Sequence, residues 1–299
     1  MFRSRIPPTA IWPWILLLIS IPFGGSEIQA QTSAHILVAS TTSTQNSGLF
    51  EHLLPKFTQE TGIDVRVVAV GTGQALRLAR RGDVDVLFVH DKPSELKLMA
   101  DGFGVERREV MYNEFVIVGP VSDPAGIRGL RNAAEAFGMI AGARALFVSR
   151  GDDSGTHKAE RRLWNLTGID VDAASGTWYR ETGSSMGATL NTARGLNAYA
   201  LTDRSTWMGF GSRDQGLHLL VEGDPRLVNQ YSVILVNPKR FPHVRAAAGC
   251  VFIDWITSVK GQDAIAGYRL GTARLFVPNH RNPDSTSGPR PSCLRAQYP

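Results

Sequence analysis

The sequence lacks the features that mark several protein classes. It has two cysteines in 299 residues, too few for a disulfide framework. Neither these nor the seven histidines show the spacing of metal ligands. Lys and Arg residues are scattered rather than massed, and the net charge is only +5, so nucleic-acid binding is not indicated. We therefore expect no metal site, no cofactor and no nucleic-acid partner.

Long apolar runs are also missing, apart from one near the N-terminus. The run Ile11–Phe23 spans 13 residues, which is too short to cross a bilayer comfortably. Arg3 and Arg5 precede it, and Ala30 offers a small residue for cleavage. This order is typical of a secretory signal peptide over residues 1–30, with an uncleaved N-terminal anchor as the alternative. No cysteine lies near the cut, so a lipid anchor is unsupported, and we expect a periplasmic or otherwise extracytoplasmic protein.

The two cysteines are expected to stay apart. Residues 279–299 are rich in Asn, Arg, Pro, Ser and Gly, a composition typical of a disordered tail. Cys293 lies in this tail, whereas Cys250 lies in an apolar helical stripe. An oxidising compartment would permit a bond between them, but one buried thiol and one tail thiol is the interpretation that we favour.

Short apolar runs alternate with amphipathic segments, which predicts an α/β fold with a mainly parallel sheet. Helical spacing of apolar residues predicts helices between the strands and near the C-terminus. The expected helices are Phe50–Phe57, Gln74–Arg81, Ala133–Ala143, Ala159–Leu166 and Val244–Trp255. The expected strands are His35–Ala39, Ile63–Val70, Val84–Val89, Phe115–Val118 and Ala145–Val148.

Three loops rich in hydroxyls and glycine each follow a predicted strand and precede a predicted helix. They are Ser40–Thr44, Gly71–Gly73 and Ser149–His157. Open α/β sheets bind ligands at this edge, and helix N-termini favour anions. Arg150 adds a planar fork for two oxygens of an oxyanion. The loops together predict one shared oxyanion site, although each alone is compatible with a plain helix cap.

Catalysis is the competing interpretation of the third loop. Ser154 or Thr156 could act as a nucleophile with His157 as its base. However, adjacent helical side chains do not face each other, and the G-x-S-x-G elbow is absent. Asp152 or Asp153 has the simpler role of capping the helix or holding Arg150. We therefore expect no enzyme, and a secreted ester or phosphate hydrolase remains the alternative from another class.

Several long motifs, in the family's order, resemble the solute-binding proteins of tungstate ABC transporters, which are periplasmic tungstate receptors. The similarity runs from about Ile36 to Pro278. The motifs are STTSTQNSGL (40–49), VGTGQAL (70–76), GDVDVLFVH (82–90), MYNEFVIVGP (111–120), SRGDDSGTHK (149–158), ETGSSMGATL (181–190) and AYALTDRSTW (198–207).

The resemblance implies a two-lobed periplasmic binding protein of type II with the ligand cleft between its lobes. Lobe one would comprise residues 31–114 and 224–278, and lobe two residues 115–223. The implied ligands are Thr41, Thr42, Ser43, Thr72, Arg150, Ser154 and Thr156. Ser184 and Ser185 are less certain contributors. This chain has STTS and GSSMGAT where family members commonly have TTTS and GQGMGAT, and these departures fall on Ser40 and Ser184. Asp152 and Asp153 are expected to support the site without contacting the anion.

The protonation state at neutral pH distinguishes the candidate oxyanions. Tungstate and molybdate are unprotonated dianions at neutral pH and need only donors, whereas hydrogenphosphate rewards a carboxylate acceptor. The resemblance and this chemistry together predict a receptor, expected to be monomeric, that binds tungstate, or else molybdate, and delivers it to an ABC permease. A phosphate receptor is the alternative, since Arg150–Thr156 is also close to a phosphate-receptor pattern. A sensor for a membrane signalling protein is a third possibility that the sequence leaves open.

Overall fold

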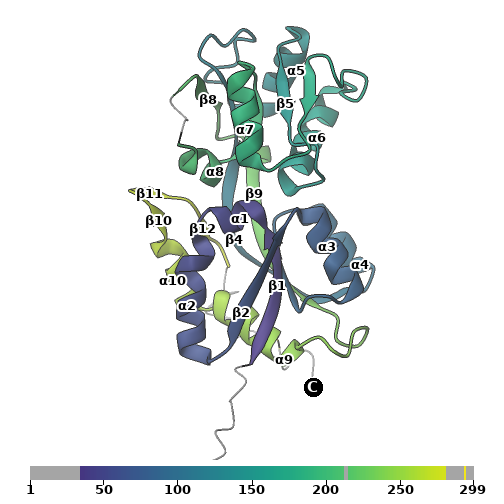
Figure 1. The fold of residues 1–299 in the computed structure, drawn as a ribbon, viewed down its shortest axis with the longest axis vertical. Coiled ribbons are helices and arrows are strands. Elements are labelled where there is room, and N and C mark those ends of the chain that lie inside the picture. The colour runs from purple at the N-terminus through teal and green to yellow at the C-terminus, as the bar shows by residue number, and fades with distance from the viewer. Residues whose placement is uncertain (1–33, 212–214, 281–292, 294–299) are drawn as a thin grey trace, which may run out of the picture. The chain divides into compact units, whose positions relative to one another are not determined.

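The structure, a computed structural model, describes residues 34–211, 215–280 and Cys293. These residues form a mixed α/β fold in which two groups of strands and helices each surround their own apolar cores (Figure 1). We call them lobe one and lobe two. The two-lobed α/β class that the sequence predicts is confirmed. The predicted signal peptide, residues 1–30, lies outside the described residues.

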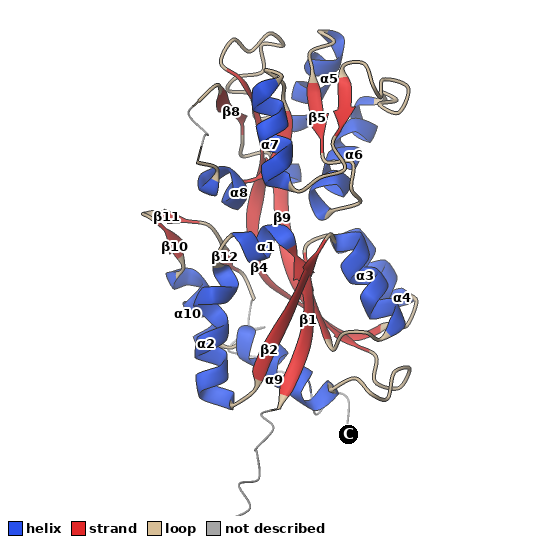
Figure 2. Ribbon diagram, in the orientation of Figure 1, coloured by secondary structure: helices blue, strands red, loops and turns tan. Residues whose placement is uncertain are grey.

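Lobe one is built on a sheet with helices on both faces (Figure 2). Alternate residues of the first strand point to opposite faces, so Ile36 and Val38 join one apolar core and Ala39 joins the other. Helices α2 (Leu49–Thr61) and α9 (Ala246–Ile256) cover the first face, and α3 (Thr72–Arg81) and α4 (Lys92–Ala100) cover the second. The strand order is β12 (Val277–Pro278), β4 (Gly104–Pro120), β9 (Val228–Val236), β3 (Val86–Val89), β1 (His35–Thr41) and β2 (Asp64–Val70).

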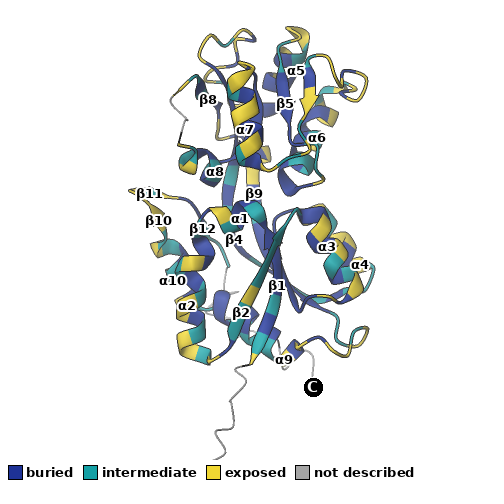
Figure 3. Cartoon of the chain, in the orientation of Figure 1, coloured by how far each residue is buried: buried dark blue, intermediate teal, exposed yellow. Residues whose placement is uncertain are grey.

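Lobe two repeats this layering on a smaller scale. Its strands are β5 (Phe147–Ser149), β6 (Tyr179–Glu181), β7 (Ala200–Asp203) and β8 (Leu217–Val221). Helices α5 (Ala133–Gly142) and α6 (Gly155–Thr167) pack on one core, and α7 (Met186–Gly195) packs on another. Their buried sides face the strands and their exposed sides face outward (Figure 3).

Strand β4 belongs to both lobes. Its residues up to Glu114 pair with β9, and those from Phe115 onward pair with β7 and β8. All these pairings are antiparallel, as is that of β3 with β9, whereas β1 pairs with β2 and β3 in parallel. The sheet is thus more mixed than predicted, because β4 and β9 are not joined to their neighbours by strand–helix–strand crossovers. The lobe limits at residues 114/115 and 223/224 stay predictions.

The expected strands and helices occur close to their predicted positions, but β4 is far longer than Phe115–Val118. Its first half carries charged side chains, so the pattern of apolar residues did not predict a strand there. Arg107 is paired with Glu95 at 2.8 Å and Arg108 with Asp254 at 2.8 Å. These partners come from α4 and α9, so tertiary ion pairs make a charged strand compatible with burial.

The expectation of two free thiols is wrong. Cys250 of α9 and Cys293 form a disulfide, with an S–S distance of 2.06 Å. Both residues are fully buried, and the backbone N–H of Cys293 donates to the carboxylate of Asp254 on α9. This anchor holds Cys293 on lobe one. Of the predicted tail, Asn279 and His280 are also described and hydrogen-bond to Val110 and Gln262, whereas residues 281–292 and 294–299 lie outside the described part.

Among the residues that the structure describes, no helix is long and apolar enough for a membrane span. Within the same residues, no group of three or more His, Cys, Asp or Glu is placed to hold a metal ion.

Candidate functional site

The first of the three loops leads from β1 into the short helix α1 (Thr42–Asn46). Thr41 is its N-cap: the Thr41 hydroxyl accepts from the backbone N–H of Thr44 at 3.3 Å. Ser43 is buried, and its hydroxyl lies 3.1 Å from that of Thr41, while Thr42 is half-buried. The hydroxyls of this loop are therefore held together at the carboxyl end of β1.

The second loop joins β2 to α3. Gly71 is the N-cap of α3 and offers no side chain to the free N–H groups. Thr72 follows it, fully buried, and its hydroxyl has no hydrogen-bond partner among the described residues. The first turn of α3 holds no acidic residue of its own, but the carboxylate of Asp153 from the third loop lies against Gly73 in that turn.

The third loop curls tightly between β5 and α6. Gly151 and Asp153 have positive φ angles of 62° and 58°, which turn the chain so that the Ser154 hydroxyl accepts from the N–H of His157 and caps α6. The first turn of α6 also lacks an acidic residue. Thr156 is 1% exposed, and no residue in the described ranges offers its hydroxyl a hydrogen-bond partner.

Arg150 is buried at the start of this loop, with 4% of its surface exposed. One terminal nitrogen donates to Asp152 Oδ2 at 2.5 Å, whereas Nε finds no partner in the described part of the chain. The other oxygen of Asp152 accepts from the N–H of Ser154 at 3.2 Å. Asp153 instead bonds Lys158 at 2.5 Å and lies 3.6 Å from Arg77 of α3. Asp152 therefore holds Arg150 in position through one nitrogen and leaves another available.

The second and third loops touch directly. The N–H of Gly73 donates to the carbonyl of Asp153 at 3.2 Å. A methyl group placed on Gly155 would lie 3.1 Å from Thr72 Oγ1 and 2.7 Å from Cε1 of His90. The structure thus brings Thr72, from lobe one, against the amino end of α6, from lobe two.

Burying polar atoms without hydrogen-bond partners at this junction destabilises the ligand-free protein. Each buried polar atom without a partner costs about 1–3 kcal/mol. The junction gathers three donors without a partner in the described residues, the hydroxyls of Thr72 and Thr156 and Nε of Arg150. Nε2 of His90 is a further polar atom there without a described partner. An oxyanion is the chemical group that satisfies several such donors at once.

The residue that the sequence analysis missed is His90. It follows β3 directly, at the same sheet edge as Thr41, and it is 4% exposed. The motif GDVDVLFVH contains it, but a lone histidine after an apolar strand gave no reason to assign it a role. Only the tertiary contact with Gly155 places it at the junction.

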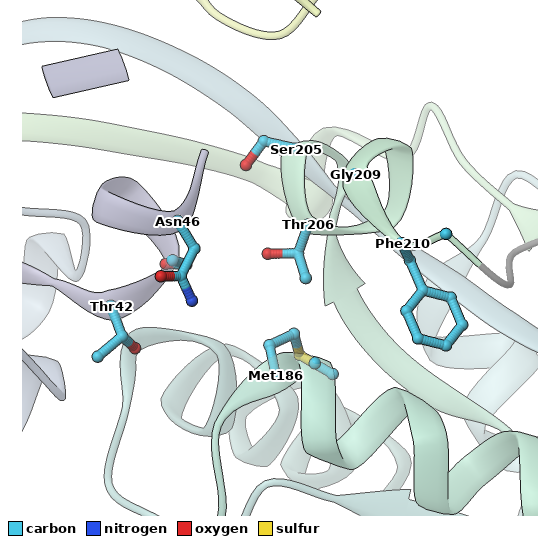
Figure 4. A pocket seen from close by; sticks show the side chains of 10 residues that line it. Thr42, Asn46, Met186, Ser205, Thr206, Gly209 and Phe210 are labelled. Atoms are coloured by element: carbon cyan, nitrogen blue, oxygen red, sulfur yellow. The ribbon is translucent and has the colours of Figure 1, made fainter. Parts of the chain in front are cut away.

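A cavity of about 210 Å³ lies beside the first loop. Thr42, Ser43 and Asn46 form one wall, and Ser205 and Thr206 of α8 (Arg204–Gly209) form another. Figure 4 shows the hydroxyl of Thr206 pointing toward Asn46 across this space. Met186 and Gly187 complete the lining with Gly209, Phe210 and Gly211. Thr72, Arg150 and Thr156 do not line this cavity, so it does not contain the junction of unpaired donors.

The two serines before α7 are placed differently from the other predicted ligands. The Ser184 hydroxyl donates to the carbonyl of Thr182 at 3.1 Å. Ser185 is the N-cap of α7, is exposed and makes no capping bond with its side chain. The Thr182 hydroxyl accepts from the N–H of Ser184 and lies 3.3 Å from the carbonyl of Arg150, so this turn lies beside the third loop. A contribution of Ser184 and Ser185 to the site stays a prediction.

The geometry does not assemble the nucleophile and base of a hydrolase. The Ser154 hydroxyl accepts from the backbone N–H of His157, and His157 Nδ1 accepts from the backbone N–H of Asp153 at 3.1 Å. Burial lowers the pKa of His157. Within the described residues, no hydrogen bond joins the Ser154 hydroxyl to the imidazole.

Comparisons with known proteins agree on one family. The PBP superfamily domain matches residues 26–260. The tungstate-binding protein TupA of Peptoclostridium acidaminophilum is 43% identical over 85% of this chain and 89% of its own length. Among solved structures, the tungstate-binding protein TupA from Desulfovibrio alaskensis is 43% identical, with a TM-score of 0.72 over 82% of this chain and 99% of that one. The structure titled as the tungstate ABC transporter from Geobacter sulfurreducens is 47% identical, with a TM-score of 0.70 over 78% of this chain and 98% of that one.

The similarity covers both lobes and nearly the full length of these relatives, so the resemblance inferred from the sequence motifs is confirmed. The chain belongs to the PBP superfamily and, within it, to the family of the TupA proteins.

Proposed function

We propose that this protein is an extracytoplasmic receptor that binds tungstate and delivers it to an ABC permease. The observation that carries the proposal is the set of buried, unpartnered donors contributed by both lobes, namely Thr72, Arg150 and Thr156. The names of the relatives support tungstate as the ligand. Export through residues 1–30, action as a monomer and docking to a permease belong to the same proposal.

Each proposed ligand has a defined way to donate. Arg150 donates one terminal N–H to Asp152. Its Nε has no partner in the described residues and can donate to an anion. The Ser154 hydroxyl accepts a backbone N–H as a cap, which leaves its own proton to donate outward. Thr41, Thr42 and Ser43 would add hydroxyls from the end of β1, and the amino ends of α3 and α6 would add their dipoles.

The same geometry favours an unprotonated anion over phosphate. Hydrogenphosphate would need an acceptor for its proton, and Asp152 is the carboxylate that contacts Arg150. One oxygen of Asp152 is bonded to Arg150 and the other to the N–H of Ser154. We propose that Asp152 and Asp153 support the loop and leave the anion to donors only.

Binding would stabilise the closed arrangement of the lobes, taken as residues 31–114 with 224–278 and residues 115–223. An anion held by donors from both lobes binds the closed state better than the open one, so it shifts the equilibrium toward closure. The contacts of Gly73 with Asp153 and of Asp91 with Arg162 cross between the lobes and would form together with the site.

Titration calorimetry with tungstate, molybdate, sulfate and phosphate tests the proposal. We expect tungstate to bind tightly, with closely similar molybdate as the nearest competitor, and phosphate to bind far more weakly. Charge-assisted hydrogen bonds contribute about 1.5–3 kcal/mol each, so several of them are sufficient for tight binding after the costs of ordering. Tighter binding of phosphate than of tungstate, or no binding of any of the four anions, would reject it.

A further inference from the structure

His90 is the member of the donor junction to which the proposed function assigns no task. Its imidazole stacks on Tyr231, with ring centroids 4.7 Å apart, and its Nδ1 lies 2.9 Å from Oδ1 of Asn229. Its Nε2 is buried and has no partner in the part of the chain that the structure describes. A methyl group on Gly155 would approach Cε1 to 2.7 Å and Nδ1 to 2.9 Å, so the amino end of α6 packs against this edge of the ring.

The tautomer of His90 is set by a chain of amides. Asn229 Nδ2 donates to Asn113 Oδ1 at 2.7 Å and approaches the Tyr231 hydroxyl at 3.3 Å. This orientation turns Asn229 Oδ1 toward the imidazole, so Nδ1 carries the proton and donates it. In a neutral ring Nε2 then presents only a lone pair, which an unprotonated oxyanion would not approach.

The charged groups around His90 leave it neutral before the anion arrives. Burial lowers the pKa of His90 below its ordinary value of 6.5, and the positive charge of Arg150 acts in the same direction. The carboxylates of Asp203 and Asp91 oppose this shift. Both carboxylates have other partners: Asp91 binds Arg162 at 2.6 Å, and Asp203 accepts from the Thr206 hydroxyl at 2.6 Å. The remaining neighbours, Asn229 and Tyr231 on β9 and Phe115 on β4, carry no charge at neutral pH.

We propose that His90 is a further ligand of the oxyanion, and that its Nε2 takes up one proton from solvent when the dianion binds. The proton adds to the Nε2 lone pair, so the imidazolium donates from Nδ1 to Asn229 and from Nε2 to the anion. A dianion beside the ring supplies the opposite charge that favours the protonated form. This inference rests on the proposed function and adds to it a proton-coupled step.

Proton coupling predicts a specific dependence of affinity on pH. Below the lowered pKa of the free protein, His90 is already charged and binding takes up no proton. Between that pKa and the higher pKa of the complex, binding takes up one proton, so Kd rises about tenfold per pH unit. Above both pKa values His90 stays neutral in the complex, and its contribution to tungstate affinity is lost. Simple anion binding by Arg150 and hydroxyls alone gives no such slope near neutral pH, because none of these groups titrates there.

Calorimetry of the full chain with tungstate at about pH 7, in buffers of different ionisation enthalpy, measures this uptake directly. We expect about one proton per tungstate for the unmodified protein and close to none for His90→Gln. His157→Gln is the matched control, because His157 is the other histidine near the third loop and burial lowers its pKa too; its uptake should persist.

Tungstate binding without proton uptake overturns the inference but leaves the receptor proposal standing. Uptake that persists in His90→Gln, or that disappears only in His157→Gln, overturns it as well. Failure of the protein to bind any of the four oxyanions overturns both. If His90→Gln fails to fold, the pH profile of Kd still tests the inference: a flat profile for the unmodified protein rejects it, and a tenfold rise per unit that persists in His157→Gln supports it.

Discussion

Arg150 is the residue whose charge the proposed site depends on most. Arg150→Ala should weaken tungstate binding at least about a hundredfold, because a buried charge-assisted bond contributes about 1.5–3 kcal/mol and the Coulombic attraction is lost with it. Arg150→Lys should lose less, since the charge stays but the planar fork does not. Calorimetry measures both. The exposed Arg131 provides the control, and equal affinities for Arg150→Ala and Arg131→Ala would contradict the assignment.

Thr72 and Thr156 allow a test in which stability and binding move in opposite directions. Replacement by Val keeps the shape and removes a buried hydroxyl that lacks a partner in the described residues. We expect the ligand-free protein to keep or gain thermal stability, while tungstate affinity falls about tenfold or more.

Thr58→Val is the matched control for these substitutions. The Thr58 hydroxyl donates to the carbonyl of Ile63 at 2.9 Å, so its loss should lower the melting temperature and leave tungstate binding intact. Thermal unfolding with and without tungstate measures both effects. Destabilisation of the ligand-free protein by Thr72→Val would mean that its hydroxyl is structural.

Most of the proposed ligands could be identified from the sequence, because hydroxyls and glycines at the ends of apolar strands are local signals. His90 and the Cys250–Cys293 disulfide could not be. His90 is placed at the proposed site by its contact with Gly155, which lies in the other lobe. The two cysteines are 43 positions apart, with an undescribed segment between them. Contacts of this kind depend on tertiary packing, which no local pattern encodes.

At the scale of elements, the amino end of α6 must approach lobe one closely. Gly155 meets His90 and Thr72 there without a side chain. Gly155→Ala should therefore weaken tungstate binding, because its methyl group would lie within 2.7 Å of His90 Cε1 and hold the lobes apart. Calorimetry together with thermal unfolding separates this effect from unfolding.

Gly138→Ala is the control for this substitution. Gly138 lies inside α5, and a methyl group there would meet nothing within 4 Å. It should leave binding unchanged and stabilise the helix by up to about 1 kcal/mol. Unchanged affinity of Gly155→Ala would contradict the close approach of α6.

The charged first half of β4 explains why sequence periodicity underestimated this strand. Arg107 and Arg108 lie within it, and their partners Glu95 and Asp254 are supplied by helices packed on opposite faces of the sheet. An alternation of charged residues is typical of a solvent-exposed segment unless such partners exist. The strand–helix alternation elsewhere has no such conflict, and the elements there were predicted well.

At the scale of the whole receptor, an ion pair between the lobes should favour the closed state. Arg162 of α6 lies 2.6 Å from Asp91, the N-cap of α4. Arg162→Gln should weaken tungstate binding several-fold at low salt without contact with the anion, since a half-exposed pair contributes about 1 kcal/mol or less. The loss should shrink as salt rises.

Arg161→Gln provides the control for this pair. Arg161 bonds Asp172 at 2.5 and 2.7 Å, and both residues lie in lobe two. Its loss should leave tungstate affinity unchanged at every salt concentration. Equal effects of the two substitutions in calorimetry would show that the pair of Asp91 with Arg162 does not assist closure.

The central claim is that donors from both lobes converge on a single tungstate. Anomalous diffraction from crystals grown with tungstate locates the tungsten atom directly. We predict one strong peak at the junction of Thr72, Arg150 and Thr156, with the tungstate oxygens within hydrogen-bonding distance of all three and no carboxylate of Asp152 or Asp153 in contact. A peak elsewhere, or a tungstate held by one lobe alone, would contradict the account.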